Sequence, residues 1–190
     1  MSEENRQSRR LFCGLPSFMH IEKLNQSHAL AYKALMLDAY RESADAYTSS
    51  YQERASQSDD WWAHRVAGSK PESVTFGGFQ AGELVATARL ELYDGHKTRH
   101  KAHLTAVYVR PAARRLGYGR GLLESVLKEA KERPGIRLVN LSVTEGNQAA
   151  LALYEKAGFI MYGVEPMAIL GTQAYLSKVL MVMTLDPISK

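Results

Sequence analysis

A buried strand, a turn rich in glycine and arginine, and an amphipathic helix follow one another without interruption near the middle of this chain. The strand is expected over Ala102–Val109, because an apolar run of this kind is typical of a central strand covered on both faces. The helix is expected from about Gly119 to Glu132, where apolar residues recur at helical spacing. This order predicts a turn whose backbone leads directly from a sheet into the start of a helix.

The turn is suited to binding a diphosphate. Gly117, Gly119 and Gly121 lack a Cβ atom, so the backbone can approach a ligand closely and adopt positive φ. The free amides at a helix start carry partial positive charge, which favours a pyrophosphate. Three arginines could add charge-assisted donors, namely Arg114, Arg115 and Arg120. The spacing Gly-x-Gly-x-Gly fits neither a dinucleotide-binding fingerprint nor a Walker A loop, which needs Gly-Lys-Ser/Thr.

The remaining sequence alternates between strand and helix patterns. We expect a strand at Met19–Leu24, a helix capped by Ser27, a loop over Ser43–Ser56, and a short helix capped at Ser58. The later elements are expected as strands Val74–Gln80 and Glu83–Tyr93 around a turn at Ala81-Gly82, strand Arg137–Val143, helix Asn147–Ala157 ended by Gly158, and strands Phe159–Val164 and Tyr175–Leu185. The prediction is an α/β (α+β) domain over 19–186, with a mixed central sheet of about seven strands and helices on both faces. Residues 1–18 are expected to form a flexible N-terminal tail.

Composition excludes several classes of protein. The single cysteine, Cys13, allows neither an intrachain disulfide framework nor a Cys-Cys zinc site, and we expect no metal. The sequence contains neither an apolar run long enough for a transmembrane helix nor a signal peptide, which favours the cytoplasm. Between His96 and Arg137 there are eleven Lys/Arg against three Glu. This stretch lacks the aromatic-basic interleaving of nucleic-acid binders, so we favour a small polyanion as its ligand.

Two separate motifs resemble the GCN5-related N-acetyltransferase (GNAT) superfamily. The first is Arg114-Arg115-Leu116-Gly117-Tyr118-Gly119, which is similar to the acyl-coenzyme A signature Arg/Gln-x-x-Gly-x-Gly/Ala. The second runs from Asn147 to Phe159 and is similar to Asn-x-x-Ala-x-x-Leu-Tyr-x-x-x-Gly-Phe. The resemblance covers Ala102–Phe159 strongly and the rest of the domain through its element order. It implies the GNAT fold, acetyl-coenzyme A as donor and transfer of the acetyl group to an amine.

The resemblance also implies roles for individual residues. The strand before the turn would present Val107, Tyr108 and Val109 to the pantetheine arm, and the backbone from Arg115 to Arg120 would hold the pyrophosphate. Tyr154 would protonate the departing thiolate, which its reference pKa of about 10 permits. Asn147 would contact the pantetheine region while also capping its helix.

The general base is less sharply indicated. His103 stands at about the position where the histone-acetylating branch of the family places a glutamate, and Glu91 on the preceding strand is a second candidate. A chain of water molecules could equally serve, without a dedicated base.

The acceptor site implied by the family lies near Tyr40–Trp62 and the hairpin of the last two strands. Five acidic residues there could attract a cationic amine: Asp38, Glu42, Asp45, Asp59 and Asp60. The aromatic residues that could line its walls are Tyr40, Tyr47, Tyr51 and Trp62. The loop of the last hairpin is expected to begin at Glu165-Pro166, and the acceptor region to extend over Glu165–Tyr175. The identity of the amine and the choice between monomer and homodimer stay open, and a non-catalytic acyl-coenzyme A sensor is the alternative function.

Overall fold

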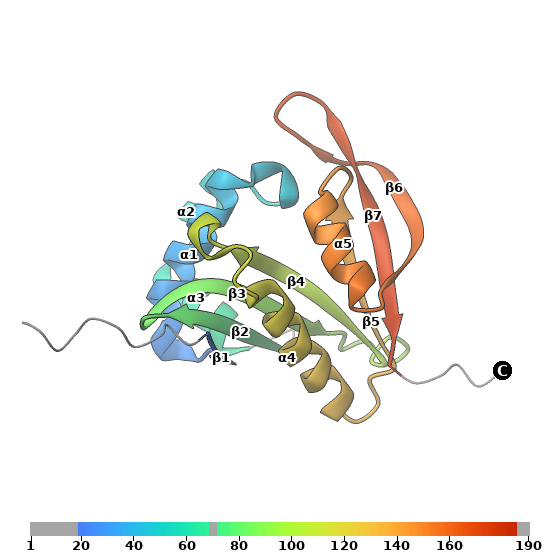
Figure 1. Ribbon diagram of the computed structural model, residues 1–190, viewed down its shortest axis with the longest axis horizontal. Helices are drawn as coiled ribbons and strands as arrows, with labels where there is room; N and C mark the ends of the chain where they lie inside the picture. Colours follow the sequence, from blue (N-terminus) through green and yellow to red (C-terminus); the bar gives the residue numbers. More distant parts are fainter. Residues whose placement is uncertain (1–18, 69–71, 186–190) are drawn as a thin grey trace, which may run out of the picture.

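The computed structural model describes residues 19–68 and 72–185. The expected tail over residues 1–18, with Cys13, and residue 186 lie outside this part of the chain. Seven strands form one mixed sheet in the order β1-β2-β3-β4-β5-β7-β6 (Figure 1). They are β1 (His20–Lys23), β2 (Ser73–Gln80), β3 (Glu83–Leu92), β4 (Lys101–Val109), β5 (Leu138–Thr144), β6 (Ile160–Leu170) and β7 (Tyr175–Thr184). The expected α/β sheet of about seven strands is confirmed.

Helices cover both faces of the sheet and create two cores. The longer helices are α1 (Ala29–Glu42), α3 (Asp59–Ala67), α4 (Tyr118–Glu132) and α5 (Gln148–Lys156). Helices α4 and α5 pack on one face, where Leu122, Val126 and Tyr154 join a core with buried strand residues. Helices α1 and α3 pack on the other face around Tyr32 and Trp62. The helix spacing read from the sequence therefore places apolar stripes against the sheet on both sides.

A bulge in β4 exchanges the two faces of that strand. Ala106 has a φ of 51°, and the register between β3 and β4 shifts between Thr87 and Arg89. Because side chains alternate along a strand, one extra residue moves every later side chain to the opposite face. Leu104 therefore packs in the core below α4, whereas Tyr108 packs in the core below α1.

Strands β4 and β5 run parallel but pair over only one end. Their ladder joins Lys101–His103 to Leu138–Asn140, and Figure 1 shows the strands diverging beyond it. β5 instead pairs with β7 along its whole length. The second half of β4 is thus left with an edge that faces a gap in the sheet.

Three local predictions were wrong. Asn25, not Ser27, provides the cap: its side chain accepts from the Ser27 amide at the start of the 3-10 turn η2 (Gln26–His28) that precedes α1. The expected loop at 43–56 contains the 3-10 turn η3 (Ala44–Ala46) and helix α2 (Tyr51–Ala55), which begins with a capping box between Ser50 and Glu53.

The third concerns the last hairpin. β6 does not turn at Glu165-Pro166 but continues to Leu170, because a register irregularity between Glu165 and Ile169 absorbs the proline. Met167, at the irregularity, has a φ of 53°. The hairpin turns instead at residues 171–174, where the Gly171 amide donates to the Ala174 carbonyl.

Other expectations were confirmed. Ser58 caps α3 by accepting from the Trp61 amide, and Gly158 follows α5 with a φ of 99°. Ala81 and Gly82 both have positive φ, as a two-residue hairpin turn requires.

Candidate active site

The segment between β4 and α4 forms a turn with outward-facing amides. Arg115 and Gly117 both have positive φ, 64° and 93°, and Gly117 precedes the first residue of α4 without a side-chain cap. The amides of Tyr118, Gly119 and Arg120 lie in the first turn, which has no intrahelical acceptor for them. They therefore form a helix N-terminus able to receive an anion, as the sequence predicts.

The three glycines have different roles. Gly117 supplies the left-handed backbone that the turn needs. A Cβ on Gly119 would lie 3.3 Å from Leu153 Cδ2, so this glycine allows α4 to approach α5. A Cβ on Gly121 would lie 2.5 Å from Ile21 Cδ1, and the Gly121 amide already donates to the Gly117 carbonyl at 3.0 Å. Gly121 thus packs α4 against β1, and its amide is not among the free donors at the helix start.

The arginines of the turn are unequally available. Arg114 Nε donates to the Val109 carbonyl at 3.1 Å, which fastens the turn to the end of β4. Arg120 pairs with Glu124 one turn later, at 2.7 Å. Among the described residues Arg115 has no side-chain partner, and it is exposed beside Leu116. Of the three, Arg115 is the one whose side chain is free to meet a phosphate.

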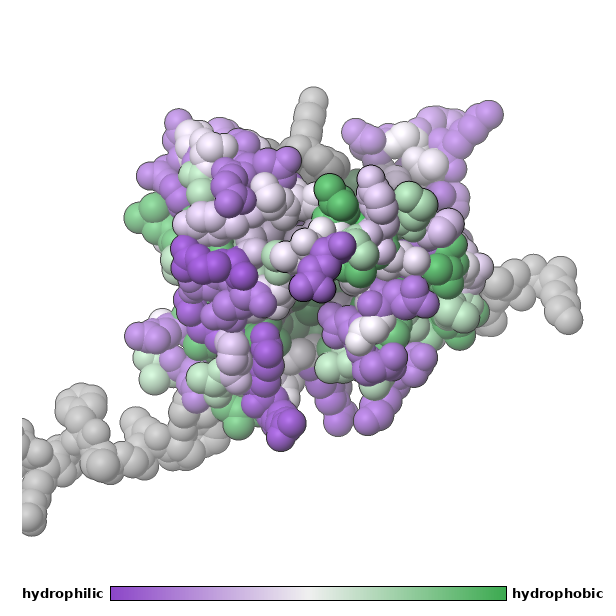
Figure 2. All heavy atoms as spheres, turned by 90° about the horizontal axis from the view of Figure 1, so that it is seen from above, coloured by the Kyte–Doolittle hydropathy of each residue, from purple (hydrophilic) through white to green (hydrophobic). Residues whose placement is uncertain are grey.

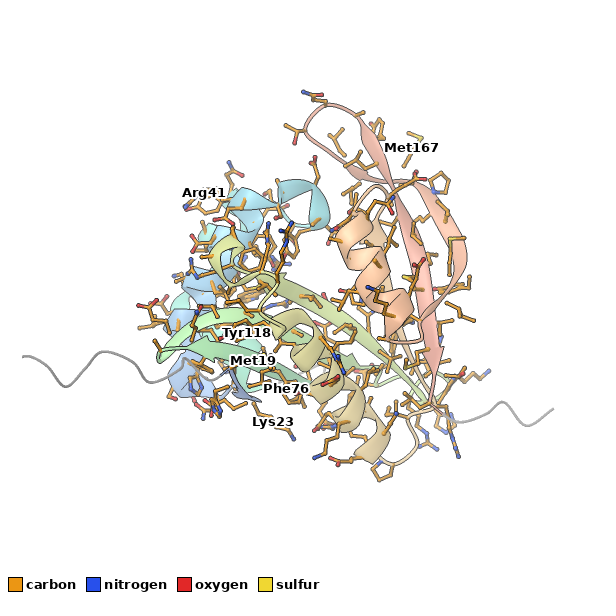
Figure 3. The ribbon with its side chains drawn as sticks, viewed as in Figure 1. Met19, Lys23, Arg41, Phe76, Tyr118 and Met167 are labelled. Atoms are coloured by element: carbon orange, nitrogen blue, oxygen red, sulfur yellow. The ribbon has the colours of Figure 1, made fainter. Side chains whose placement is uncertain are left out.

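Two aromatic residues assigned to coenzyme binding point into the protein. The Tyr108 hydroxyl donates to Glu42 Oε2 at 2.6 Å on the α1 side, because the bulge at Ala106 turns it away from the α4 side. The Tyr118 hydroxyl donates to the Phe79 carbonyl at 2.9 Å, and its ring lies over the sheet (Figure 3). Both hydroxyls are engaged within the protein, so a contact of Tyr108 or Tyr118 with the coenzyme would have to come from the backbone.

Along the edge of β4 that diverges from β5, two backbone carbonyls already accept hydrogen bonds from side chains. The Val107 carbonyl accepts from the Tyr47 hydroxyl at 3.2 Å, and the Val109 carbonyl accepts from Arg114. The Arg110 amide donates to the Val85 carbonyl on β3, so by the alternation of an antiparallel ladder Val109 directs its backbone groups toward the gap. A ligand in the gap would find the Val109 amide as a donor.

Tyr154 lies at the bottom of this gap. A cavity of about 210 Å³ between the diverging strands is lined by Tyr154 and Asn147 from α5 and by Val107 from β4. Tyr154 is 6% exposed and packs edge-on against Phe159, with ring centres 5.8 Å apart. Burial raises the pKa of Tyr154, so its hydroxyl stays protonated at neutral pH. The Asn147 side chain caps α5 by accepting from the Ala150 amide.

Of the two candidate bases, His103 lines the same cavity and Glu91 does not. His103 Nδ1 lies 2.6 Å from Asn140 Oδ1, and because a carboxamide oxygen only accepts, Nδ1 is the donor in this contact. Glu91 instead lies 3.3 Å from Arg89, a guanidinium only 2% exposed. Removing the partner of a buried charge is costly, so Glu91 has a structural role, but the register of β3 and β4 places it directly opposite His103 and its assignment as a base stays a prediction.

Two cavity residues were missed by sequence reasoning. Lys178 on β7 is 8% exposed, and burial lowers its pKa while Glu165 opposes that change. Pairing of Thr144 with Lys178 places both on the face that carries Asn140. The lone lysine in an apolar strand was the available signal. Tyr47 was expected only as a wall of the acceptor site, yet it holds the Val107 carbonyl.

A larger hollow adjoins the cavity. It has a volume of about 610 Å³ and is lined by residues 41–46, by residues 144–147, and by Thr172 and Leu176 of the last hairpin. It shares Ala46, Thr144 and Asn147 with the smaller cavity, so the two are adjacent. We call this hollow the acceptor groove.

The expected acidic lining of the acceptor groove is mostly engaged. Asp38 pairs with Arg110 at 2.7 Å, and Asp59 pairs with Lys33 at 2.6 Å. Asp45 Oδ1 accepts from both the amide and the hydroxyl of Thr172. The lining carboxylates of the groove are Glu42, Asp45 and Glu145, and Arg41, labelled in Figure 3, lines it too.

The expected aromatic lining is also incomplete. Trp62 is fully buried, with its ring centre 5.9 Å from that of Tyr32, and forms no wall. Tyr40 is buried against Tyr47, and the Tyr51 hydroxyl accepts from Arg41. Four of the residues expected around the acceptor therefore do not line the acceptor groove, namely Asp38, Asp59, Asp60 and Trp62.

Two further observations concern residues 19–68 and 72–185. No group of three His, Cys, Asp or Glu side chains there could hold a metal ion. None of the helices in those ranges combines the length and the apolar character needed to cross a membrane.

Comparisons with known proteins agree on the family. Residues 36–159 match the family model for the Acetyltransferase (GNAT) family. A stretch of 59 residues is 42% identical to the ribosomal protein bS18-alanine N-acetyltransferase of Escherichia coli (strain K12). The stretch makes up 31% of this chain and 39% of that relative.

Solved structures share the fold at low identity. An acetyltransferase of the GNAT family from Streptococcus pneumoniae has a TM-score of 0.80 at 19% identity, over 89% of this chain and all of that one. The putative acetyltransferase yncA from Salmonella typhimurium, solved with its cofactor acetyl-CoA, has a TM-score of 0.74 at 20% identity, over 92% and 98% of the two chains. The family model covers well over half of the sequence, and the chain belongs to the GNAT acetyltransferase family.

Proposed function

We propose that this protein transfers the acetyl group of acetyl-coenzyme A directly to a primary amine, on a small molecule or a peptide. One observation carries the proposal: the end of β4 that is not paired with β5 and Tyr154 border the same cavity, and Gly119 at the start of α4 lines a small void together with Val107 and Tyr154. The family and the acetyl-CoA-bound neighbour support the donor.

The chain's backbone would bind the donor at two points. The amides of Tyr118, Gly119 and Arg120, with the Arg115 guanidinium, would hold the pyrophosphate at the N-terminus of α4. The Val107 and Val109 amides would hold the pantetheine arm as an added strand and polarise the thioester carbonyl. Asn147, at the mouth of the cavity, would contact the same arm.

The transfer needs one proton donor and one proton acceptor. The neutral amine would attack the thioester carbonyl, so that a C–N bond forms and the C–S bond breaks. Tyr154 would give its proton to the departing thiolate. His103 Nε2 would take the proton lost by the amine, directly or through water, because the contact with Asn140 occupies Nδ1 and leaves Nε2 as the other ring nitrogen.

The acceptor would enter through the acceptor groove. Its three carboxylates against one arginine favour a positively charged amine. The curated relative's name points to the terminal amine of an alanine, so peptide amines belong in any test beside amino acids, polyamines and aminoglycosides. A cytoplasmic location remains an expectation from sequence.

The deciding experiment combines calorimetry with an acceptor screen. Acetyl-coenzyme A is expected to bind, and one class of amine in the panel is expected to cause thiol release. Binding without release for every amine would favour the alternative, an acyl-coenzyme A sensor. Strongly salt-dependent binding to DNA or RNA, without coenzyme binding, would instead indicate a nucleic-acid-binding domain and contradict both.

A further inference from the structure

Lys178 is a buried amine that lines the same cavity as Tyr154. It lies on β7, is 8% exposed, and borders the cavity of about 210 Å³ between the diverging strands. Lysine is almost never this buried without a paired charge, because an ammonium group is costly to remove from water. Packing alone does not account for a lysine at this position.

No carboxylate is paired with Lys178. In the part of the chain that the structure describes, its Nζ atom takes part in neither an ion pair nor a hydrogen bond. Glu165, its cross-strand neighbour on β6, is exposed and acts on it only through space, and the cavity lining contains no Asp or Glu. Burial therefore lowers the pKa of Lys178, although Glu165 opposes the change, and this increases the share of the neutral, nucleophilic amine.

The amine group of Lys178 is open to the cavity. Among the described residues, the side-chain nitrogen and oxygen atoms that are enclosed without a partner belong to other side chains, and Lys178 Nζ is not one of them. The side chain as a whole is nevertheless covered. The surface that Nζ keeps therefore faces the cavity that Lys178 lines.

Strand pairing brings this amine toward the reaction centre. Lys178 lies opposite Thr144 on β5, so their Cα atoms are about 4.5–5.5 Å apart, and Thr144 lines the same cavity. The four-carbon stem of a lysine is longer than this separation. Nζ can therefore extend past β5 toward the side of the cavity where Tyr154 and the edge of β4 would hold the thioester.

An acceptor from solution must enter from outside, whereas Lys178 is already in the cavity. Figure 2 views the molecule from above Figure 1 and shows a hollow between the half that carries α1 and α2 and the half that carries α5 and the last hairpin. An external amine enters through this hollow at a rate set by its concentration. The effective concentration of Lys178 is set by the fold alone.

We propose that Lys178 is a self-acetylation site, whose Nζ takes the acetyl group of bound acetyl-coenzyme A when no other acceptor is present. The inference rests on the proposed function, because it uses the same donor and the same proton donor. The neutral Nζ attacks the thioester carbonyl, so that a C–N bond forms and the C–S bond breaks. Tyr154 protonates the departing thiolate, and the proton lost by the amine passes to His103 or to water. The product is an uncharged amide, which removes the cost of a buried ammonium group.

Mass spectrometry of the full chain with acetyl-coenzyme A, and with no added amine, tests the proposal. The wild type is expected to gain one acetyl group, mapped to Lys178, and to release one equivalent of thiol per chain. A buried amine is reached only within its own molecule, so the rate constant should not change across a hundredfold range of protein concentration. Lys128, whose side chain is 75% exposed on α4, reports the uncatalysed reaction, and Lys178 is expected to react at least about 100-fold faster.

Three variants assign the modification. Lys178→Arg keeps the charge without a nucleophilic amine and should abolish both the added mass and the single equivalent of thiol. Tyr154→Phe should slow acetylation of Lys178 by about 10²- to 10⁴-fold without slowing that of Lys128. Lys128→Arg is the matched control and should leave acetylation of Lys178 unchanged.

Three results with the wild type would overturn the proposal without depending on the folding of any variant. They are a chain that binds acetyl-coenzyme A by calorimetry but leaves Lys178 unacetylated, equal acetylation of Lys178 and Lys128, and a rate constant that rises with protein concentration. Thiol release with an added amine, but no acetyl group on Lys178, would overturn this inference and leave the proposed function standing. A chain that does not bind acetyl-coenzyme A would contradict both.

Discussion

Asp45 connects two sides of the acceptor groove that lie far apart in the sequence. Its carboxylate accepts from the Thr172 amide at 3.1 Å and from the Thr172 hydroxyl at 3.0 Å, joining η3 to the turn of the last hairpin. The Asp45 carbonyl separately accepts from the Thr144 hydroxyl at 2.7 Å. Asp45→Ala removes the two carboxylate contacts and leaves the backbone contact, so the hairpin turn is released while η3 stays anchored.

The expected size of the effect follows from these contacts. Hydrogen bonds to a charged group contribute about 1.5–3 kcal/mol each when buried. Both partners here are exposed, and solvent screening reduces the sum to about 1 kcal/mol. If the turn positions the acceptor, Asp45→Ala lowers kcat/KM for the acceptor about fivefold through KM. The coenzyme affinity should not change, because Asp45 does not line the smaller cavity.

The assay is thiol release at saturating acetyl-coenzyme A with the acceptor varied, together with calorimetry for the coenzyme. Asp45→Asn keeps one accepting oxygen without the charge and should give an intermediate KM. Asp60→Ala, on α3 and outside the groove, is the matched control. An unchanged acceptor KM in Asp45→Ala, or an equal loss of coenzyme affinity, would refute the role of this contact.

Four further substitutions separate catalysis, binding and packing. Tyr154→Phe should lower kcat by about 10²- to 10⁴-fold with coenzyme affinity unchanged by calorimetry, and equal turnover would reduce the hydroxyl to packing. Because burial raises the pKa of Tyr154, the wild-type rate should not fall near pH 10 through its ionisation. Gly119→Glu should abolish coenzyme binding, and because a Cβ there would also meet Leu153 of α5, the melting temperature is measured beside the affinity; a folded variant with retained affinity would contradict the site. Gly121→Ala should lower the melting temperature without weakening coenzyme binding, and the reverse pattern would return Gly121 to the binding site. His103→Ala should alter the acidic limb of the pH–rate profile, and an unaltered profile would exclude it as the base.

Local sequence patterns predicted the elements that position the site. The apolar run of β4, the helical spacing of α4, and the Asn147 and Gly158 boundaries of α5 each depend on residues close together in the chain, and all were confirmed. Helix α2 was missed although its capping box, Ser50 with Glu53, is also local. The capping box predicts a helix start there, but the serine-rich composition around it favoured a loop.

The remaining site depends on contacts that no local pattern contains. The pairing of Asp38 with Arg110 joins residues far apart in sequence and removes an expected acceptor contact. The pairing of Glu91 with Arg89 is close in sequence, yet its importance depends on the burial of Arg89, which only the packed sheet shows. The bulge at Ala106 has no sequence marker, because alanine rarely adopts positive φ.

That bulge limits which acyl-group donors the protein can use. It fixes where the free amides of β4 begin, while Gly117 fixes where the helix start begins, and the chain between Ala106 and Gly117 sets the span from one to the other. Under the proposed function, this distance must match the length of the arm that joins a thioester to its diphosphate. A thioester on a shorter arm could bind at the β4 amides or at the start of α4, but not at both sites at once.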